Sequence, residues 1–540
     1  MRKQNGIIFS FIILIHSSVS AQIRMPYLIK KGTTEQLIVD GKPFLVLGGE
    51  LGNSTASSLD YMRPVWSKFK AMNLNTILSP VYWELLKPKE GTFDFTLVDN
   101  IIKAARKNNL RVILLWFGSW KNSMSCYAPA WIKTNESRFP RAQDNTRKGL
   151  EILSAFSKNN LDADEAAFAV LMKHIKETDK SHTVIMVQVE NEIGMLTEAR
   201  ERTADADKAF DRDVPRELMN YLITNKDSLV PELKDQWSKT NFTTNGNWEN
   251  VFGKSPATDE IFQAWYYAKY ANAVAAAGKN EYSLPMYVNA ALNYRNVKPG
   301  QYPSAGPLPH LMDIWQVAAP SIDILSPDFY NPYFKQYCDL YTRRNNPLFI
   351  PEIRFEPSDA AKVFYAIGHY QAIGYSPFSI ESTDKPKEEP ISKAYSILSQ
   401  LSPEILKYTG TGKMEGVLLD SQNKKQEIIL GNYKLSVAHD YTLGWSPDAL
   451  KPGWPITGCI IIQENENDFI IAGTGVVVTF SVIGTNRISA GILQANEGKY
   501  INGKWQPGRR MNGDQDHQGR HIRVPVSEWN IQRVKLYQYK

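Results

Sequence analysis

The stretch TVIMVQVENEIG, residues 183–194, shows most clearly how this chain is built. It begins as a near-continuous run of apolar and β-branched residues and ends in Glu190, Asn191 and Glu192, just before Gly194. Such a run is expected for a parallel strand that is covered on both faces. Carboxylates at its end are costly to bury unless they are paired or functional. The stretch therefore predicts a buried parallel strand with chemistry at its carboxyl end.

Seven other segments share this pattern and alternate with segments of helical periodicity. The eight expected strands are Pro43–Gly49, Asn75–Tyr82, Arg111–Phe117, Thr183–Glu190, Pro285–Ala291, Ile322–Phe329, Leu348–Glu352 and Gly374–Ile380. Strands that alternate with crossover helices form a parallel sheet, and eight of them close a (β/α)₈ barrel. One helical stripe contains Phe168, Leu171 and Ile175, and we expect its N-cap at Asp162 or Asp164.

The 540 residues are too many for one ordinary domain. We expect the barrel to occupy residues 22–403 and an antiparallel β-sandwich to occupy residues 404–540, where short β-prone runs are separated by turn signals such as Asn502-Gly503. A long, charged insertion lies between Gly194 and Ala257. Insertions after barrel strands lie on the carboxyl face, where active sites are found. This insertion is therefore expected to form one side of an active-site cleft.

The N-terminus, residues 1–21, has the pattern of a secretory signal peptide. Arg2 and Lys3 precede the apolar run Ile7–Ile15, and Val19-Ser20-Ala21 offers a small-residue cleavage site before Gln22. The apolar run is too short to cross a bilayer, and no other segment is long enough. The mature chain is therefore expected to lack a membrane span and to be secreted or periplasmic.

The bulk composition excludes several classes of function. A net charge of +6 without a Lys/Arg block gives no support to nucleic-acid binding. Cys126, Cys338 and Cys459 lack metal-ligand spacing and are expected as buried free thiols, with one long-range disulfide left open. The run 512–517 resembles a calcium loop but lacks its terminal Glu. No metal and no cofactor are expected.

A second acidic residue, Glu352, ends the seventh expected strand and should face Glu192 across the barrel mouth. Glycoside hydrolysis needs such a pair. One carboxylic acid protonates the leaving oxygen, and the other attacks the anomeric carbon at about 5–5.5 Å separation or activates water across a wider gap. The alternative is a structural salt bridge, for instance between Glu352 and Arg354.

The residues Gln188–Gly194 resemble the acid/base motif of the β-galactosidases of glycoside hydrolase family 35. Pro80-Val81-Tyr82-Trp83-Glu84 and Gly48–Asn53 extend the resemblance, and the chain is also similar to family 42. The resemblance implies that Glu192 is the acid/base, that Asn191 binds the sugar 2-hydroxyl, and that Glu352 is the nucleophile of a retaining enzyme. Glu190 lies one position too early in the motif to take one of these roles, so it would support these residues without contacting the substrate.

The chain departs from the family after the third strand. Most members have Cys-Ala-Glu-Trp there, with a Glu that binds sugar hydroxyls, whereas this chain has Phe117-Gly118-Ser119-Trp120. Glu50 or Asn122 could replace the missing carboxylate. Asp328 with Tyr330 could position Glu352. Aromatic residues at or beyond strand ends are expected either to stack on sugar or to pack at the rim; they are Trp83, Trp116, Trp120, Tyr330 and Tyr333.

The sequence thus predicts a retaining, exo-acting β-galactosidase that hydrolyses terminal β-galactosyl residues of an oligo- or polysaccharide. Another retaining β-glycosidase of the same clan, such as an arabinopyranosidase or a xylosidase, is the nearest alternative. A non-catalytic glycan-binding protein on a decayed barrel is the alternative from another class. Because the chain retains Asn191, Glu192 and Glu352, the non-catalytic alternative is disfavoured.

Overall fold

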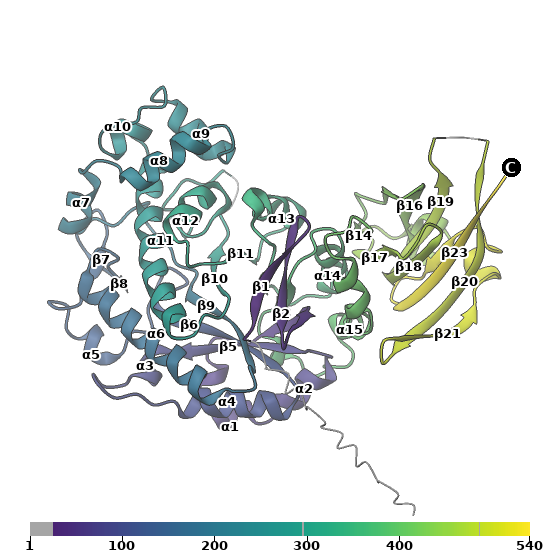
Figure 1. Cartoon of the computed structure of the whole chain (residues 1–540), viewed down its shortest axis with the longest axis horizontal. Helices are drawn as coiled ribbons and strands as arrows, with labels where there is room; N and C mark the ends of the chain where they lie inside the picture. The colour runs from purple at the N-terminus through teal and green to yellow at the C-terminus, as the bar shows by residue number, and fades with distance from the viewer. Residues whose placement is uncertain (1–24, 294–295, 485–486) are drawn as a thin grey trace, which may run out of the picture.

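The computed structural model describes residues 25–293, 296–484 and 487–540. The predicted signal peptide falls in residues 1–24, outside the described residues. Eight parallel strands close into a barrel at the centre of the larger lobe (Figure 1). They are β4 (Val46–Glu50), β5 (Thr76–Tyr82), β6 (Arg111–Lys121), β9 (Val184–Asn191), β10 (Met286–Ala291), β11 (Ile324–Phe329), β12 (Ile350–Ile353) and β13 (Gly374–Pro377). All eight predicted strands are present, and the (β/α)₈ fold is confirmed.

Helices cover the outside of the barrel and bury their apolar stripes against it. They include α3 (Trp83–Leu86), α4 (Thr96–Lys107), α5 (Ala130–Lys133), α6 (Lys158–Thr178), α11 (Pro256–Glu281), α12 (Met312–Ala318), α13 (Phe334–Tyr341), α14 (Asp359–Gly368) and α15 (Pro390–Tyr408). Pro64 lies in the turn that separates α1 (Leu59–Met62) from α2 (Trp66–Ala71), as expected for a residue that cannot continue a helix. Two small sheets lie outside the barrel. One precedes it and contains β1 (Tyr27–Lys31), β2 (Thr34–Val39) and β3 (Lys42–Phe44), and the other is the pair β7 (Arg141–Gln143) and β8 (Gly149–Leu153).

The expected N-cap of α6 is wrong. The helix begins earlier, because the side chain of Ser157 accepts a hydrogen bond from the backbone N–H of Asn160 and caps it. Asp162 is then an exposed residue in the second turn, where it pairs with Lys158. Asp164 is completely buried and points towards the barrel, which matters for the site described below.

The insertion between β9 and β10 folds into helices. These are α7 (Ala204–Phe210), α8 (Arg216–Asn225), α9 (Pro231–Ser238) and α10 (Trp248–Phe252), and they cap the end of α11 (Figure 1). Trp248 is fully buried against Phe252 and Phe262, so it forms the small core of this cap. The insertion is therefore a packed subdomain of the barrel.

The C-terminal lobe is a sandwich of two antiparallel sheets. One has the order β14-β17-β18-β23-β20-β21 and the other β15-β16-β19-β22. The strands are β14 (Met414–Leu419), β15 (Lys425–Leu430), β16 (Tyr433–His439), β17 (Thr457–Gln463), β18 (Asp468–Thr474), β19 (Val476–Val482), β20 (Ser489–Ile501), β21 (Lys504–Arg510), β22 (Ile522–Val524) and β23 (Asn530–Tyr539). The predicted hairpin turn joins β20 to β21, with positive φ at both Asn502 (49°) and Gly503 (72°).

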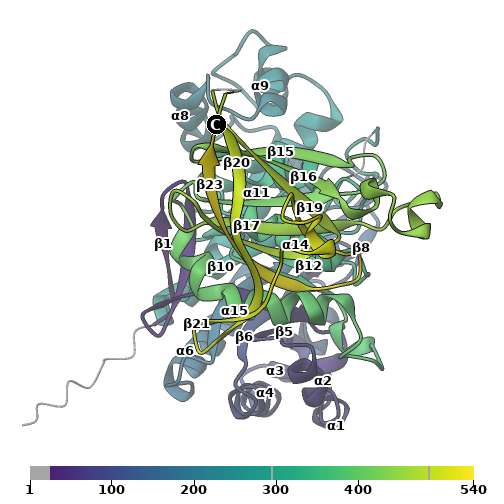
Figure 2. The same cartoon turned by 90° about the vertical axis from the view of Figure 1, so that its right-hand side faces the viewer.

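The sandwich packs directly on the barrel helix α14 (Figure 2). A Cβ atom on Gly416 of β14 would lie 2.8 Å from the carbonyl oxygen of Phe364, and one on Gly458 of β17 would lie 3.0 Å from that of Ala361. Glycine is thus required for the strand backbones to touch the helix. The helix α15 runs through Pro403, so the predicted boundary at residue 403 falls inside a barrel helix.

All three cysteines are buried and free, so the open question of a disulfide is settled for this structure. Of the helices in the described part of the chain, none combines the length and the apolar character that a bilayer span requires.

Candidate active site

Four acidic side chains meet at the carboxyl ends of the barrel strands. Glu50 ends β4, Asp328 lies in β11 and pairs in register with Glu352 of β12, and Glu192 directly follows β9. Each of the four exposes 6% of its surface or less. The same end of the barrel thus gathers the two acids that the sequence predicted to react, together with two more.

The surroundings of Glu352 and Glu192 raise the pKa of both carboxyls above the ordinary value of a glutamate. Burial and the charge of Glu192 raise the pKa of Glu352 to about 7, while the Tyr330 hydroxyl and the Lys121 ammonium oppose this rise. Tyr330 donates a hydrogen bond to Oε1 of Glu352. Burial also raises the pKa of Glu192, against the ammonium of Lys121 and a hydrogen bond from Asn122. A carboxyl that keeps a proton near neutral pH can act as a general acid.

Glu50 is the third carboxyl of the cluster. Among the described residues, its oxygens have no hydrogen-bond partner outside the acid cluster, where the carboxyl of Glu352 lies within reach. Burial and the neighbouring charge of Glu352 raise its pKa well above the ordinary value. No ion pair joins Arg354 to Glu50 or Glu352 in the described part of the chain, since Arg354 is exposed and stacks over the ring of Tyr330 at 5.5 Å. The salt-bridge alternative for these acids is therefore wrong.

A wide bulge at the end of β6 explains the departure from the family pattern. Trp116 pairs with Val189 and Lys121 pairs with Asn191, so four residues of β6 bulge out where β9 has only one. In this bulge the Ser119 hydroxyl turns away from the barrel mouth and bonds to Asp164 and to Tyr270. Lys121 and Asn122, which come next, reach the acid cluster instead.

Asn191 and Asn122 flank Glu192, and Asn122 donates a hydrogen bond to its carboxyl group. Oδ1 of Asn191 accepts a hydrogen bond of 2.8 Å from Nζ of Lys121, and its Nδ2 is buried with no partner among the described residues. Asn289 of β10 accepts a 3.0 Å hydrogen bond from the backbone N–H of Glu192 and donates one of 2.6 Å to Asp328. Asn289 and Lys121 were missed from the sequence, because neither lies in a strand-end motif that stood out.

Behind the bulge lies a second pair of buried acids that does not reach the mouth. Oε2 of Glu190 accepts from the backbone N–H of Trp120 at 2.9 Å, and Oδ1 of Asp164 accepts from Trp116 at 2.9 Å. Burial and the charge of Asp164 raise the pKa of Glu190 well above normal. Glu190 thus supports the bulge from behind, which agrees with the predicted supporting position, and Asp164 from α6 is its unforeseen partner.

Three of the predicted stacking residues are core residues. Trp83, Trp116 and Trp120 are fully buried, and Trp120 packs edge-on against Tyr267 and Tyr270 with centroid distances of 5.1 and 4.8 Å. In this structure the three rings pack in the core, and Trp120 does so because the bulge folds it inwards with Ser119. Tyr330 and Tyr333 keep part of their surface exposed.

Three residues beside the acids have a strained backbone. Glu190, Glu192 and Asn122 have φ values of 62°, 47° and 54°, in the left-handed region that side chains other than glycine seldom adopt. Such strain persists only where surrounding structure enforces it, and it clusters at functional sites.

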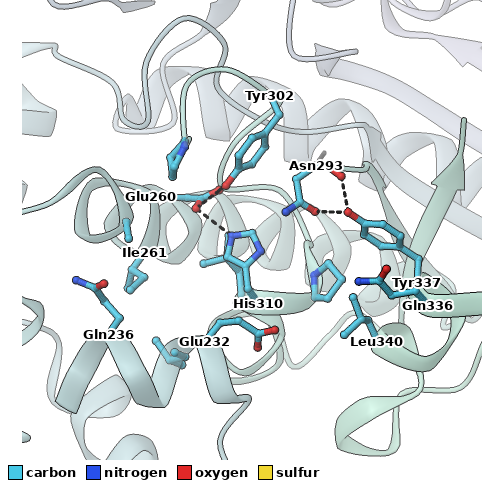
Figure 3. A pocket seen from close by; sticks show the side chains of 15 residues that line it. Glu232, Gln236, Glu260, Ile261, Asn293, Tyr302, His310, Gln336, Tyr337 and Leu340 are labelled. Carbon is cyan, nitrogen blue, oxygen red and sulfur yellow. Dashed lines mark hydrogen bonds and ion pairs between the residues drawn. The ribbon is translucent and has the colours of Figure 1, made fainter. Parts of the chain in front are cut away.

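A separate pocket of about 370 Å³ lies between α9, α11 and α13 (Figure 3). Its central acid is Glu260, whose oxygens accept from the hydroxyl of Tyr302, the ring of His310 and the backbone N–H of Ala305. Because these contacts use its acceptor capacity, Glu260 acts as a brace for the loop after β10, and the pocket does not include the acid cluster.

Comparison with known proteins agrees with this geometry. The model of the "Glycosyl hydrolases family 35" matches residues 36–260, and a "Domain of unknown function (DUF5597)" matches residues 391–523. A "Beta-galactosidase" of Xanthomonas manihotis is 28% identical over 177 residues, which cover 32% of this chain and 27% of that relative. The match therefore spans about a quarter of the relative's length.

Solved structures of β-galactosidases also match this chain at low identity. A catalytic mutant of a family 42 β-galactosidase from G. stearothermophilus has a TM-score of 0.50 and 11% identity over 91% of this chain and 98% of that chain. A cold-adapted β-galactosidase from Rahnella sp. R3 has a TM-score of 0.45 and 16% identity over 66% of this chain and 56% of that chain. The resemblance to the glycosyl hydrolases of family 35, inferred from the motif around Glu192, is thus confirmed over residues 36–260.

Proposed function

We propose that this protein is an exported, retaining β-galactosidase that releases terminal β-galactosyl residues from an oligo- or polysaccharide. The observation that carries the proposal is the placement of Glu192 and Glu352, at the ends of β9 and β12, in one buried cluster of acids. Export follows from the pattern of residues 1–21, and the family relationship supports hydrolysis of a glycosidic bond.

In the proposed reaction Glu352 attacks the anomeric carbon while Glu192 protonates the departing glycosidic oxygen. The glycosyl–Glu352 ester is then hydrolysed by a water that Glu192, now a carboxylate, deprotonates. The Tyr330 hydroxyl supports this order of events, since its hydrogen bond favours the ionised form of Glu352. Burial raises the pKa of Glu192, which favours the protonated form that the first step needs.

Recognition of the sugar is assigned to polar atoms that lack partners in the described part of the chain. Both oxygens of Glu50, Nδ2 of Asn191 and Oδ1 of Asp328 are buried in this way. Buried polar groups are costly unless they are hydrogen-bonded, so these atoms suit the hydroxyl groups of a sugar. Hydrogen bonds to the hydroxyl groups of a bound sugar would offset much of the cost of burying these atoms.

The competing activities are those of a β-xylosidase or an arabinopyranosidase, whose pentose substrates lack the C6 hydroxymethyl group. Initial rates on nitrophenyl β-galactoside, β-xyloside and α-arabinopyranoside separate them. We expect the highest kcat/KM for the galactoside; preference for a pentoside would replace the galactosidase assignment, and no turnover of any would favour a glycan-binding role.

The stereochemical course is a direct test of the nucleophile. We expect β-galactose as the first product from a β-galactoside, because attack by Glu352 and then by water inverts the anomeric carbon twice and returns the original configuration. Proton NMR of the product before mutarotation reads this out. An initial α-anomer would mean a single displacement by water and would remove Glu352 as nucleophile.

Replacing Glu50 with glutamine tests the residue that we assign to the sugar's 3- and 4-hydroxyls. We expect kcat/KM for β-galactosides to fall about tenfold or more, because the glutamine amide accepts at only one of its two polar atoms, and a buried hydroxyl left unpaired costs roughly 1–3 kcal/mol. The thermal unfolding midpoint near neutral pH should not fall, because the raised pKa of Glu50 means that the folded state disfavours its ionised form, and glutamine never ionises. Glu217→Gln on α8, whose carboxylate only pairs with Lys269 on the surface, is the control. Unchanged galactoside kinetics in Glu50→Gln would remove it from sugar recognition.

A further inference from the structure

The bulge of β6 delivers a lysine into the acid cluster. Lys121 exposes 5% of its surface, and its Nζ lies 4.9 Å from the ring centroid of Phe117. The ammonium donates to Oδ1 of Asn191 over 2.8 Å and also to Oδ1 of Asn122. One cation thus holds the two amides that flank Glu192.

A lysine ammonium can only donate hydrogen bonds, whereas an asparagine amide has a donating end and an accepting end. An amide that meets Lys121 must therefore turn its oxygen to the lysine and its nitrogen away. Nδ2 of Asn122 then donates to Oε2 of Glu192, and Nδ2 of Asn191 is left buried without a partner among the described residues. A neutral group in place of the ammonium would permit either orientation of both amides.

The lysine cannot easily leave this position, because its loop is tied to the strand end that carries the acid. The backbone N–H of Asn122 donates to the carbonyl oxygen of Asn191 at 3.2 Å, and the hydroxyl of Ser123 donates to that of Glu192 at 2.7 Å. Asn122 and Ser123 both adopt left-handed φ values, of 54° and 56°. The contacts thus lock the loop in a conformation that is strained for these residues.

We propose that Lys121 is the positioning residue that fixes both asparagine amides, so that Asn191 donates to the substrate's 2-hydroxyl and Asn122 donates to Glu192. This inference rests on the proposed function, since it assigns a task in glycoside hydrolysis. It explains how a chain without the family's usual sugar-binding Glu after the third strand still organises that side of the site.

The charges around Lys121 agree with this role. It faces Glu192 after β9, Glu352 on β12 and Glu50 on β4, and its ammonium lowers the pKa of each of these carboxyls against the effect of burial. Other titratable groups at the same end of the barrel are Asp328 of β11 and the hydroxyl groups of Tyr287 and Tyr330.

The test compares two substrates across variants of the full-length enzyme. For each variant, kcat/KM is measured on nitrophenyl β-galactoside and on its 2-deoxy analogue, and the ratio reports how much the enzyme gains from the 2-hydroxyl. The intrinsic reactivities of the two substrates cancel when variants are compared. We expect Lys121→Met to lower this ratio about tenfold or more and Lys121→Arg, which still only donates, to preserve most of it.

A double variant makes the test specific for Asn191. In an Asn191→Ala background, Lys121→Met should change the ratio no further, because the amide that the lysine orients is gone. Lys133→Met on α5, which removes a half-buried lysine outside the cluster, should leave the ratio unchanged. If Lys121→Met does not fold, Lys121→Gln retains a polar contact but can both donate and accept, and it should still lower the ratio.

Two outcomes would overturn the inference. An active Lys121→Met or Lys121→Gln enzyme with the wild-type ratio would show that the lysine does not orient Asn191, as would full additivity with Asn191→Ala. If the wild-type enzyme fails to hydrolyse the β-galactoside at all, the proposed function itself is wrong, and the role of Lys121 falls with it.

Discussion

Glu352→Gln should reduce turnover of every glycoside by about 10⁴-fold or more, the scale of loss that follows removal of a catalytic nucleophile. The amide is nearly the same size as the carboxyl and can still contact Tyr330, so the site should keep its shape. What it loses is the atom that bonds to the anomeric carbon. The loss should be equal for activated and unactivated leaving groups, because no glycosyl-enzyme can form with either.

The pH dependence of thermal unfolding shows whether the Glu352→Gln variant is folded. The pKa of Glu352 in the folded state, about 7, is above its ordinary value of 4.5, so the folded protein favours the protonated carboxyl. The stabilisation from that proton is fully present below pH 4.5 and is lost as the pH rises through 7. Glutamine, which never ionises, should therefore raise the unfolding midpoint at pH 8 relative to wild type and lose that advantage towards pH 5. An inactive variant with a lower midpoint at pH 8 would instead indicate misfolding.

Glu192→Ala should give a loss that depends on the leaving group. For substrates with poor leaving groups, such as alkyl galactosides or oligosaccharides, we expect kcat/KM to fall about 10²–10⁴-fold, the usual contribution of general acid catalysis. For dinitrophenyl galactosides the first step needs no proton, so kcat/KM should fall much less. Steady-state kinetics over a series of aryl galactosides of graded leaving-group pKa measures this difference.

Rescue by an external nucleophile is a second test of Glu192 as the acid/base. With Glu192 removed, azide should restore turnover of activated substrates and yield a β-galactosyl azide, because it attacks the glycosyl-enzyme without needing a general base. Glu190→Ala is the instructive comparison, since Glu190 lies two residues away and contacts the bulge. Its effect should be independent of the leaving group. Equal losses for Glu192→Ala across the whole series would contradict the acid/base role.

The barrel and its two central acids could be predicted from the sequence because their signals are local. Each strand of the barrel is a short apolar run, and a carboxylate such as Glu192 or Glu352 at the end of such a run stands out against the cost of burying it. Several sandwich strands lacked this contrast: β20, for example, mixes exposed and half-buried residues along Ser489–Ile501.

The parts of the site that were missed depend on tertiary contacts. Whether Ser119 or Lys121 faces the mouth is decided by the bulge, and the bulge is held by Asp164 from a helix about forty residues further along the chain. A strand pattern contains no sign of this partner. The burial of Trp120 follows from the same bulge.

The junction between barrel and sandwich bears on how such a chain can evolve. The family of unknown function that matches residues 391–523 begins inside α15, the last barrel helix, and Met414 and Ile460 of the sandwich share one continuous apolar core with the barrel. A gene fusion that exchanged only the sandwich would separate strands from a helix that their glycines touch. The C-terminal region therefore shares its packing with the barrel, and we expect a chimaera that exchanges it to fold only if α15 and a compatible α14 face are carried along with it.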